Sequence, residues 1–129
     1  MANYALITAA GIGKRMQNKI HKIFLSLDEG PIITRILQKF QGCKAIDRII
    51  VIVREDDKQE IEKIVKKNNF TKVWKIVRGG EKRQDSVYNG IKSIENAKAE
   101  DIVLIHNGAN PFIDGKTILE SIDAAKKYG

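Results

Sequence analysis

Four short apolar runs divide the chain, and none of them alternates strictly between apolar and polar residues. The runs are Tyr4–Thr8, Ile49–Val53, Val73–Val77 and Ile102–Ile105. Strands of a parallel sheet show this pattern because helices cover both faces of the sheet, so both faces need apolar side chains. The pattern therefore predicts four buried, parallel strands.

Between these runs, the apolar positions change to the spacing of an amphipathic helix. Pro31 is predicted to begin the first helix and Gly42 to end it. We expect the second helix to end near Asn68 and Asn69, and Asp114 to precede the fourth. The predicted core-facing residues of the four helices are, in chain order, Ile33, Ile36, Leu37 and Phe40; Ile61, Ile64 and Val65; Val87, Ile91 and Ile94; and Ile118, Leu119, Ile122 and Ala125.

The alternation of strands and helices predicts an α/β domain over residues 1–129, with right-handed crossovers, a mostly parallel sheet and helices on both faces. In such folds, ligands bind beyond the carboxyl ends of the strands. Three glycine-bearing loops fall at these ends, namely Ala9–Lys22, Arg78–Arg83 and His106–Pro111. We therefore expect the three loops to form one site.

Composition places the chain among soluble globular proteins. Its 129 residues, 43% of them hydrophobic, are enough for one domain with a core, and no apolar stretch is long enough to cross a membrane. The single cysteine, Cys43, cannot form an internal disulfide, and the amino terminus has no signal-peptide pattern. A cytoplasmic location is expected.

The net charge favours an anionic ligand. The chain has 23 Lys and Arg against 16 Asp and Glu, a formal charge of +7. Many of the lysines alternate with acids on predicted solvated helix faces, and aromatic residues, at 6%, are too few for base-stacking platforms. We therefore expect a small polyanion and no nucleic-acid partner.

The loop after the first strand combines glycines with cations. It reads AAGIGKRM over residues 9–16 and is followed by Lys22. Glycines let backbone N–H groups approach an anion, and Lys and Arg supply the opposite charge. The loop is neither a dinucleotide fingerprint, because Met16 stands where a small residue is needed, nor a P-loop. Taken alone, it fits a phosphate site and a purely structural turn equally well.

Three ordered motifs together resemble a known family. They are AAGxGxRM at residues 9–16 with Lys22, GGExRxDSV at residues 79–87, and HxGAxP at residues 106–111. They resemble the 2-C-methyl-D-erythritol 4-phosphate cytidylyltransferases of isoprenoid biosynthesis and their ribitol-5-phosphate relatives, over nearly the whole chain. Three motifs at compatible spacings are far more specific than one glycine loop.

The resemblance implies a Rossmann-like nucleotidyltransferase fold and a defined reaction. A phosphate oxygen of a polyol phosphate attacks the α-phosphorus of CTP, giving a CDP-linked polyol and pyrophosphate. Arg15 and Lys22 match the catalytic cations of the family. A phosphate nucleophile is already ionised near neutral pH, so aligning the two polyanions and stabilising charge are the main tasks. The acceptor remains open between methylerythritol phosphate and ribitol phosphate.

The resemblance also implies a set of CTP-binding residues. They are Ala9, Ala10, Gly11 and Gly13 in the first loop, and Gly79, Gly80, Glu81, Arg83 and Ser86 in the second. Main-chain groups of Gly79–Glu81 and the Ser86 hydroxyl would surround the edge of cytosine. The structural alternative is that the two glycines turn the chain and that Asp85 or Ser86 belongs to the start of a helix. Both interpretations can hold together, and Arg83 could bind ligand or brace the loop.

The third motif departs from the family. Asn107 and Asn110 stand where the family has an Asp, the expected Mg²⁺ ligand, and an Arg. An Asn oxygen can bind magnesium but brings no charge, so Asn107 is the predicted metal position with weakened affinity. His106 ends a buried strand, where we expect a hydrogen-bonded structural residue.

Family members continue well past the position of Gly129, with an arm that builds a homodimer and basic residues for the acceptor phosphate. The resemblance therefore implies the CTP-binding part of the enzyme, truncated at the carboxyl terminus, which would bind CTP weakly and turn over poorly. The alternative is a non-catalytic CTP-binding module or an inactive fragment. A dinucleotide-binding oxidoreductase ranks below both, because of Met16 and because Asp28 and Glu29 are predicted to form a turn.

Overall fold

The computed structural model describes residues 2–9, 26–27, 30–80, 82–94, 101–107 and 115–128. Its strands are β1 (Asn3–Thr8), β2 (Ser26–Leu27), β3 (Gly30–Pro31), β4 (Arg48–Val53), β5 (Val73–Arg78) and β6 (Ile102–Asn107). Its helices are α1 (Ile32–Gln41), α2 (Lys58–Asn68), α3 (Arg83–Lys92), α4 (Gly115–Tyr128) and the short 3-10 helix η2 (Glu55–Asp57).

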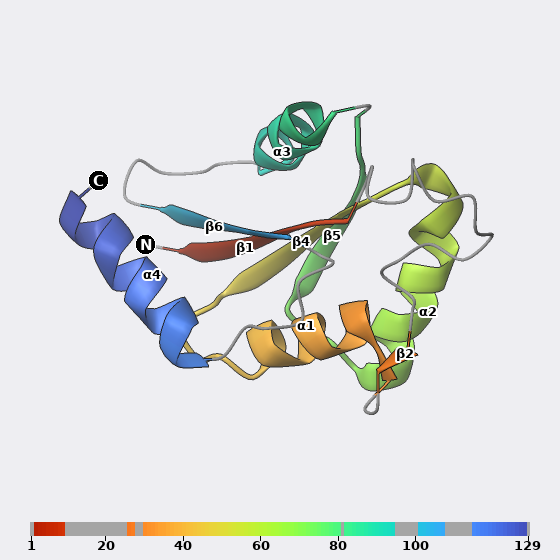
Figure 1. Ribbon diagram of the computed structural model, residues 1–129, viewed down its shortest axis with the longest axis horizontal. Coiled ribbons are helices and arrows are strands. Elements are labelled where there is room, and N and C mark those ends of the chain that lie inside the picture. Colours follow the sequence, from red (N-terminus) through yellow and green to blue (C-terminus); the bar gives the residue numbers. More distant parts are fainter. Residues whose placement is uncertain are drawn as a thin grey trace.

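The four predicted strands form one parallel sheet in the order β5-β4-β1-β6. Figure 1 shows this sheet in the middle of the molecule. At its carboxyl edge, Thr8 of β1 lies opposite Ile52 of β4 on one side and opposite Asn107 of β6 on the other. The prediction of a parallel α/β sheet is confirmed, and β1 is placed between strands that come from distant parts of the sequence.

Helices cover both faces of the sheet, as predicted. Figure 1 shows α3 on one side, with α1, α2 and α4 on the other. The larger core joins these three helices to the sheet through fully buried residues such as Phe40, Ile61 and Ile118, and the smaller core lies on the α3 side around Leu6 and Ile52. None of the helices in the described ranges is long and apolar enough to cross a membrane.

Helix α3 lies close against the sheet because of Gly90. A Cβ atom built on this buried glycine would lie 2.6 Å from the Cδ1 atoms of both Leu6 and Ile52. The absence of a side chain therefore lets the helix backbone approach β1 and β4. This approach sets the position of the first turn of α3, next to the carboxyl edge of the sheet.

The element boundaries differ from the prediction at the first helix. Helix α1 begins at Ile32, whereas Pro31, the predicted first residue, belongs to β3. The antiparallel pair β2 and β3 was not predicted, because two-residue strands carry no periodic signal. Asp28 and Glu29, the predicted turn, lie outside the described residues. Asn69 ends α2 as expected, in the left-handed conformation with φ 55°.

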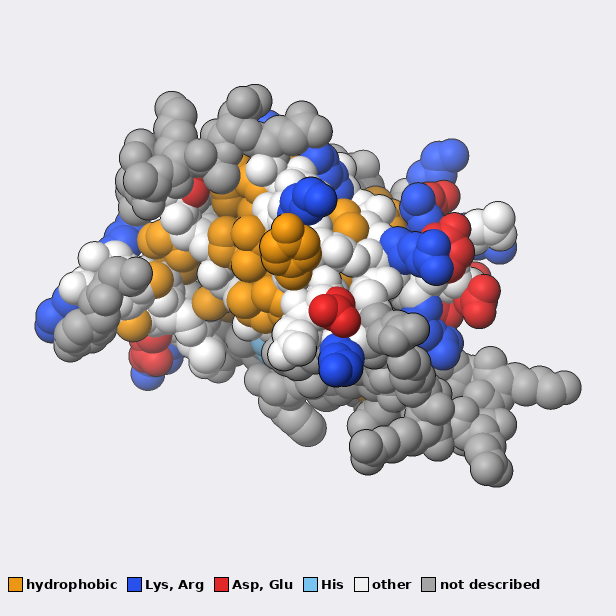
Figure 2. All heavy atoms as spheres, turned by 90° about the horizontal axis from the view of Figure 1, so that it is seen from above, with side chains coloured by type: hydrophobic (Ala, Val, Ile, Leu, Met, Phe, Trp, Pro, Cys, Tyr) orange, Lys and Arg blue, Asp and Glu red, His pale blue; other side chains and the backbone are white. Residues whose placement is uncertain are grey.

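Two predicted core positions are wrong. Ile91 is 46% exposed and Leu119 is 49% exposed. Helix α3 lies against the sheet at Gly90, the buried Ile94 follows the end of the helix, and α4 buries Ile118 and Ile122. Both helices therefore bury a narrower stripe than the periodicity suggested. Figure 2, which looks onto the α3 side, shows hydrophobic side chains reaching the surface there.

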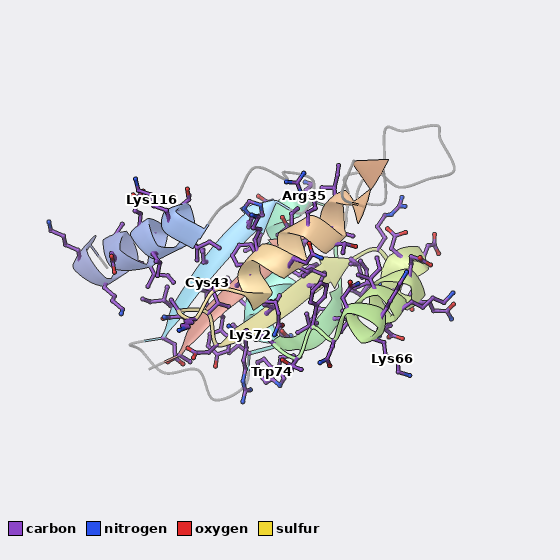
Figure 3. The ribbon with its side chains drawn as sticks, turned by 90° about the horizontal axis from the view of Figure 1, so that it is seen from below. Arg35, Cys43, Lys66, Lys72, Trp74 and Lys116 are labelled. Carbon is purple, nitrogen blue, oxygen red and sulfur yellow. The ribbon has the colours of Figure 1, made fainter. Side chains whose placement is uncertain are left out.

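The amino edge of the sheet carries a cluster of cations around one aromatic ring. The guanidinium carbon of Arg48 and Nζ of Lys75 each lie 4.5 Å from the centre of the Trp74 ring, and the Tyr4 ring lies 6.0 Å away. Figure 3 labels Trp74 at this end of β5. Arg48 begins β4 and Arg54 follows its last residue, so one strand has an arginine at each end.

Candidate functional site

The carboxyl edge of the sheet is the candidate site. All four strands end there because they are parallel, and the predicted ligand loops follow β1, β5 and β6. The fourth loop follows β4, which lies between β1 and β5. The structure therefore places the end of β4 between Ala9 and Gly79, the residues at which the predicted phosphate loop and the predicted cytosine loop leave the sheet.

The first residues of these two loops are both bonded to β4. The N–H of Ala9 donates to the carbonyl of Ile52 at 2.7 Å, and the N–H of Gly79 donates to the carbonyl of Val53 at 2.9 Å. Successive carbonyls of a strand point to opposite sides. Two neighbouring residues of β4 thus hold one loop on each side, which fixes the separation of the loops where they leave the sheet.

Gly80 folds back onto the first turn of α3. Its N–H donates to Oγ of Ser86 at 3.1 Å, and Ser86 is only 1% exposed. A Cβ atom on Gly80 would lie 2.4 Å from Cβ of Asp85, too close for any side chain. The helix-start interpretation of Asp85 and Ser86 is confirmed, since α3 begins at Arg83. A ligand role for Ser86 stays a prediction, and its hydroxyl proton is still available to donate.

The end of β6 is held against β1 and α1. The Thr8 hydroxyl donates to the carbonyl of His106 at 3.3 Å, and the His106 ring packs against Phe40 with 5.5 Å between ring centres. These contacts fit the predicted structural role of His106. The backbone of Asn107 pairs with Thr8 at the sheet edge, while its side chain lies outside what the structure describes.

Several predicted site residues lie outside the described part of the chain. The backbone of Arg83 begins α3, but its side chain is not described. The predicted roles of the following residues therefore stay predictions: Ala10, Gly11, Gly13, Arg15, Lys22 and Glu81. Ala9, Gly79, Gly80 and Ser86 are the predicted CTP-binding residues whose surroundings the structure shows.

Two residues at this edge were missed by the sequence analysis. Arg54 follows β4 directly, and its Nε lies 3.1 Å from Oδ2 of the buried Asp57. A signal was present, because Arg54 is the first polar residue after a buried run, in the same position relative to its strand as the three glycine-bearing loops. It was missed because the loop after β4 contains no glycine.

A hollow of about 480 Å³ opens beside the start of α2. Glu55, Asp56 and Glu62 line it together with Lys58 and Gln59. Three carboxylates against one cation repel a triphosphate, so this hollow is a poor site for the predicted ligand.

The described residues contain no group of three or more His, Cys, Asp or Glu that could hold a metal ion. In this part of the chain, magnesium therefore has no ready set of anionic ligands. The predicted metal position at Asn107 stays a prediction, because its side chain lies outside the described part of the structure.

Comparison with known proteins gives a consistent family. The model of the 2-C-methyl-D-erythritol 4-phosphate cytidylyltransferase family matches residues 3–129. Curated proteins with that name are 44% identical over 128 residues in Clostridium acetobutylicum and 43% identical over 127 residues in Clostridium botulinum strain Langeland. Each comparison covers 98% of this chain and 55% of the relative.

Solved structures agree with this family. The 4-diphosphocytidyl-2C-methyl-D-erythritol synthase of Anaerococcus prevotii has a TM-score of 0.78 and 29% identity, covering 98% of this chain and 51% of that one. The Francisella tularensis 2-C-methyl-D-erythritol 4-phosphate cytidylyltransferase has a TM-score of 0.72 and 28% identity, covering 98% and 52%. The chain thus spans about half the length of the relatives it matches.

Proposed function

Because the chain belongs to the 2-C-methyl-D-erythritol 4-phosphate cytidylyltransferase family, we propose that it binds CTP and serves the transfer of CMP to a polyol phosphate, with release of pyrophosphate. The observation that carries this proposal is the bonding of Ala9 and Gly79 to neighbouring carbonyls of β4. It supports the proposal because the loop predicted to bind phosphate and the loop predicted to bind the base begin on the two sides of one strand end, as a ligand with a phosphate tail and a base would require.

At its two glycines, the second loop can offer a nucleotide base hydrogen-bond acceptors but no free main-chain donors. The N–H of Gly79 is used by Val53 and the N–H of Gly80 by Ser86. What remains at these glycines is their carbonyl oxygens, which match the exocyclic amine of cytosine and oppose the O4 oxygen of uracil. The Ser86 hydroxyl proton suits a ring acceptor of the same base. The loop is therefore proposed to select cytosine over uracil.

In the proposed reaction, the acceptor phosphate oxygen forms a bond to the α-phosphorus of CTP, and the bond from that phosphorus to the bridging oxygen breaks. Pyrophosphate leaves with the bonding electrons. Arg15 and Lys22 are proposed to stabilise the charge on the transferred phosphoryl group, and the N–H groups of the loop that contains Gly11 and Gly13 to hold the phosphate tail. No proton needs to be removed from the nucleophile.

Magnesium is proposed to enter with the triphosphate. Asn107, at the end of β6, is the proposed protein ligand, through its amide oxygen. The acceptor is proposed to be 2-C-methyl-D-erythritol 4-phosphate, the substrate named for the relatives, with ribitol 5-phosphate next. A homodimer is proposed by analogy with the family, with neither nucleic acid nor a membrane as partner. Cys43, buried and free, fits a cytoplasmic location.

A second candidate is a CTP-binding module without turnover. It is favoured by one observation, the uncharged Asn107 at the proposed metal position. Binding needs only the two loops, whereas catalysis also needs charge at the α-phosphate. The two candidates share the site and differ in the need for a divalent ion.

Calorimetric titration tests the shared claim. CTP, UTP, ATP and GTP are titrated into the protein with and without magnesium. We expect CTP to bind at least about tenfold more tightly than UTP, since an opposed acceptor pair costs about 1–3 kcal/mol. Equal affinities for CTP and UTP would contradict the proposed base selection. An absence of binding by any of the four would contradict the proposed function itself.

A further inference from the structure

Arg54 directly follows the two residues of β4 that bond the first residues of the two predicted ligand loops. The carbonyls that hold Ala9 and Gly79 belong to Ile52 and Val53, the two residues immediately before Arg54. Any movement of the chain at Arg54 is therefore transmitted first to the bonds that fix the start of each loop.

The side chain of Arg54 ties this point down. Its Nε lies 3.1 Å from Oδ2 of Asp57 and its Nη2 lies 3.5 Å from Oδ1, while the N–H of Asp57 donates to the Arg54 carbonyl at 2.9 Å. The guanidinium fork thus meets the carboxylate at two points. Side chain and main chain together close the turn that leads from β4 into η2.

The environment of this pair favours a fixed geometry. The Asp57 side chain is 9% exposed and that of Arg54 is 34% exposed. The carboxylate therefore lies within the protein, and the guanidinium group lies between it and the solvent. A charge pair screened from water on one side is stronger than a surface pair, and its two-point contact restricts rotation.

We propose that Arg54 is a positioning residue of the nucleotide site, which sets the distance between the phosphate loop and the base loop by clamping the end of β4 to Asp57. The proposal rests on the proposed function for the identity of the ligand. It predicts that loss of Arg54 weakens the binding of a ligand that contacts both loops, because that binding depends on the separation of the loops. The binding of a ligand that contacts only one loop should not depend on this separation.

The first test measures amide hydrogen exchange in the ligand-free protein by NMR. In Arg54→Ala, we expect the exchange of the Ala9 and Gly79 amides to accelerate at least about tenfold relative to the amide of Ile49, which donates to Lys72 at the amino end of β4. Arg48→Ala is the matched control, since it removes an exposed arginine from the other end of the same strand. We expect no such relative change there.

The exchange ratio decides the proposal without any ligand. If Ala9 and Gly79 accelerate no more than Ile49, Arg54 does not hold the two loops and the proposal is overturned. Arg54→Lys keeps the charge but not the fork, and is measured in case the alanine variant does not fold. We expect it to show the same pattern at smaller size.

The second test follows binding of CTP, cytidine and inorganic tripolyphosphate by chemical shift. In Arg54→Ala, we expect CTP affinity to fall about tenfold while the affinities for cytidine and tripolyphosphate change less than about twofold. An equal loss for tripolyphosphate would overturn the proposal in favour of direct contact with phosphate. If the wild-type chain does not bind CTP, the proposed function fails, while the exchange ratio still decides the role of Arg54.

Discussion

At the scale of single residues, the site is built from main-chain groups whose directions are set by small or buried side chains. Gly80 has no room for a side chain beside Asp85, and the buried hydroxyl oxygen of Ser86 accepts a hydrogen bond from the N–H of Gly80. With the bond from Gly79 to Val53, the main-chain donors of both glycines are already engaged within the protein. The proposed base selection thereby depends on local packing, and two substitutions test it.

Replacement of Gly80 by alanine should displace the second loop. The new Cβ would meet Cβ of Asp85 at 2.4 Å, so backbone must shift by several tenths of an ångström. We expect CTP affinity to fall at least about tenfold, or 1.4 kcal/mol. Gly115→Ala is the control, because nothing lies within 4 Å of a Cβ there. Unchanged CTP affinity in the Gly80 variant, measured by calorimetry, would show that this loop does not contact the nucleotide.

Replacement of Ser86 by alanine should destabilise the fold as well as weaken the site. The partly buried N–H of Gly80 loses its acceptor, a change that costs about 1 kcal/mol. Ser121→Ala is the matched control, since that hydroxyl bonds the Thr117 carbonyl at an exposed position. The stability of both variants is measured by urea unfolding, followed by the fluorescence of Trp74, the single tryptophan. Equal midpoints for the two variants would contradict the bracing role of Ser86.

At the scale of secondary-structure elements, β4 organises the molecule. It lies in the interior of the sheet, and residues 49–53 are buried. Helix α2 returns from its end to β5, with Ile61 as its fully buried residue, while α3 crosses the opposite face on Gly90. The position of the carboxyl edge therefore depends on how these two helices pack.

The difference between buried and exposed isoleucines provides a test of this packing. Ile61→Ala removes a fully buried side chain from α2, and we expect a loss of about 2–5 kcal/mol in the free energy of unfolding. Ile91→Ala, at a position 46% exposed on α3, should cost less than about 1 kcal/mol. Urea unfolding curves compare them. A larger loss for Ile91 than for Ile61 would contradict the observed orientation of α3.

At the scale of the whole molecule, the described elements bear on the proposed CTP binding more than on the proposed transfer. The chain covers about half of its curated relatives, and the proposed acceptor site is not among the described residues. The formal charge of +7 favours the approach of a triphosphate in general, but catalysis requires cations fixed at the α-phosphate.

We therefore expect the 129-residue chain to bind CTP but to release pyrophosphate slowly with 2-C-methyl-D-erythritol 4-phosphate. The expected rate is at least about 100-fold below that of the Clostridium acetobutylicum relative, a loss comparable to that of one preorganised donor. A coupled pyrophosphate assay on both proteins, with and without magnesium, measures it. Comparable rates would show that the half of the relatives that lies beyond this match is dispensable for transfer.

The sequence alone determined the strands, the helices, the parallel sheet and the family. Buried strands such as Ile49–Val53 must be continuously apolar, and the order and spacing of the three motifs can be read from the sequence without knowledge of the fold. Local periodicity fails where a helix buries only part of its apolar stripe, as at Ile91, or where strands are as short as β2 and β3.

Only the tertiary structure decided how the site is held together. That Ala9 and Gly79 bond neighbouring carbonyls of β4 follows from the strand order β5-β4-β1-β6, in which β4 lies between β1 and β5. Strand order depends on contacts between residues far apart in the sequence. Local patterns carry no information about those contacts, because the same apolar run fits any interior position of a parallel sheet.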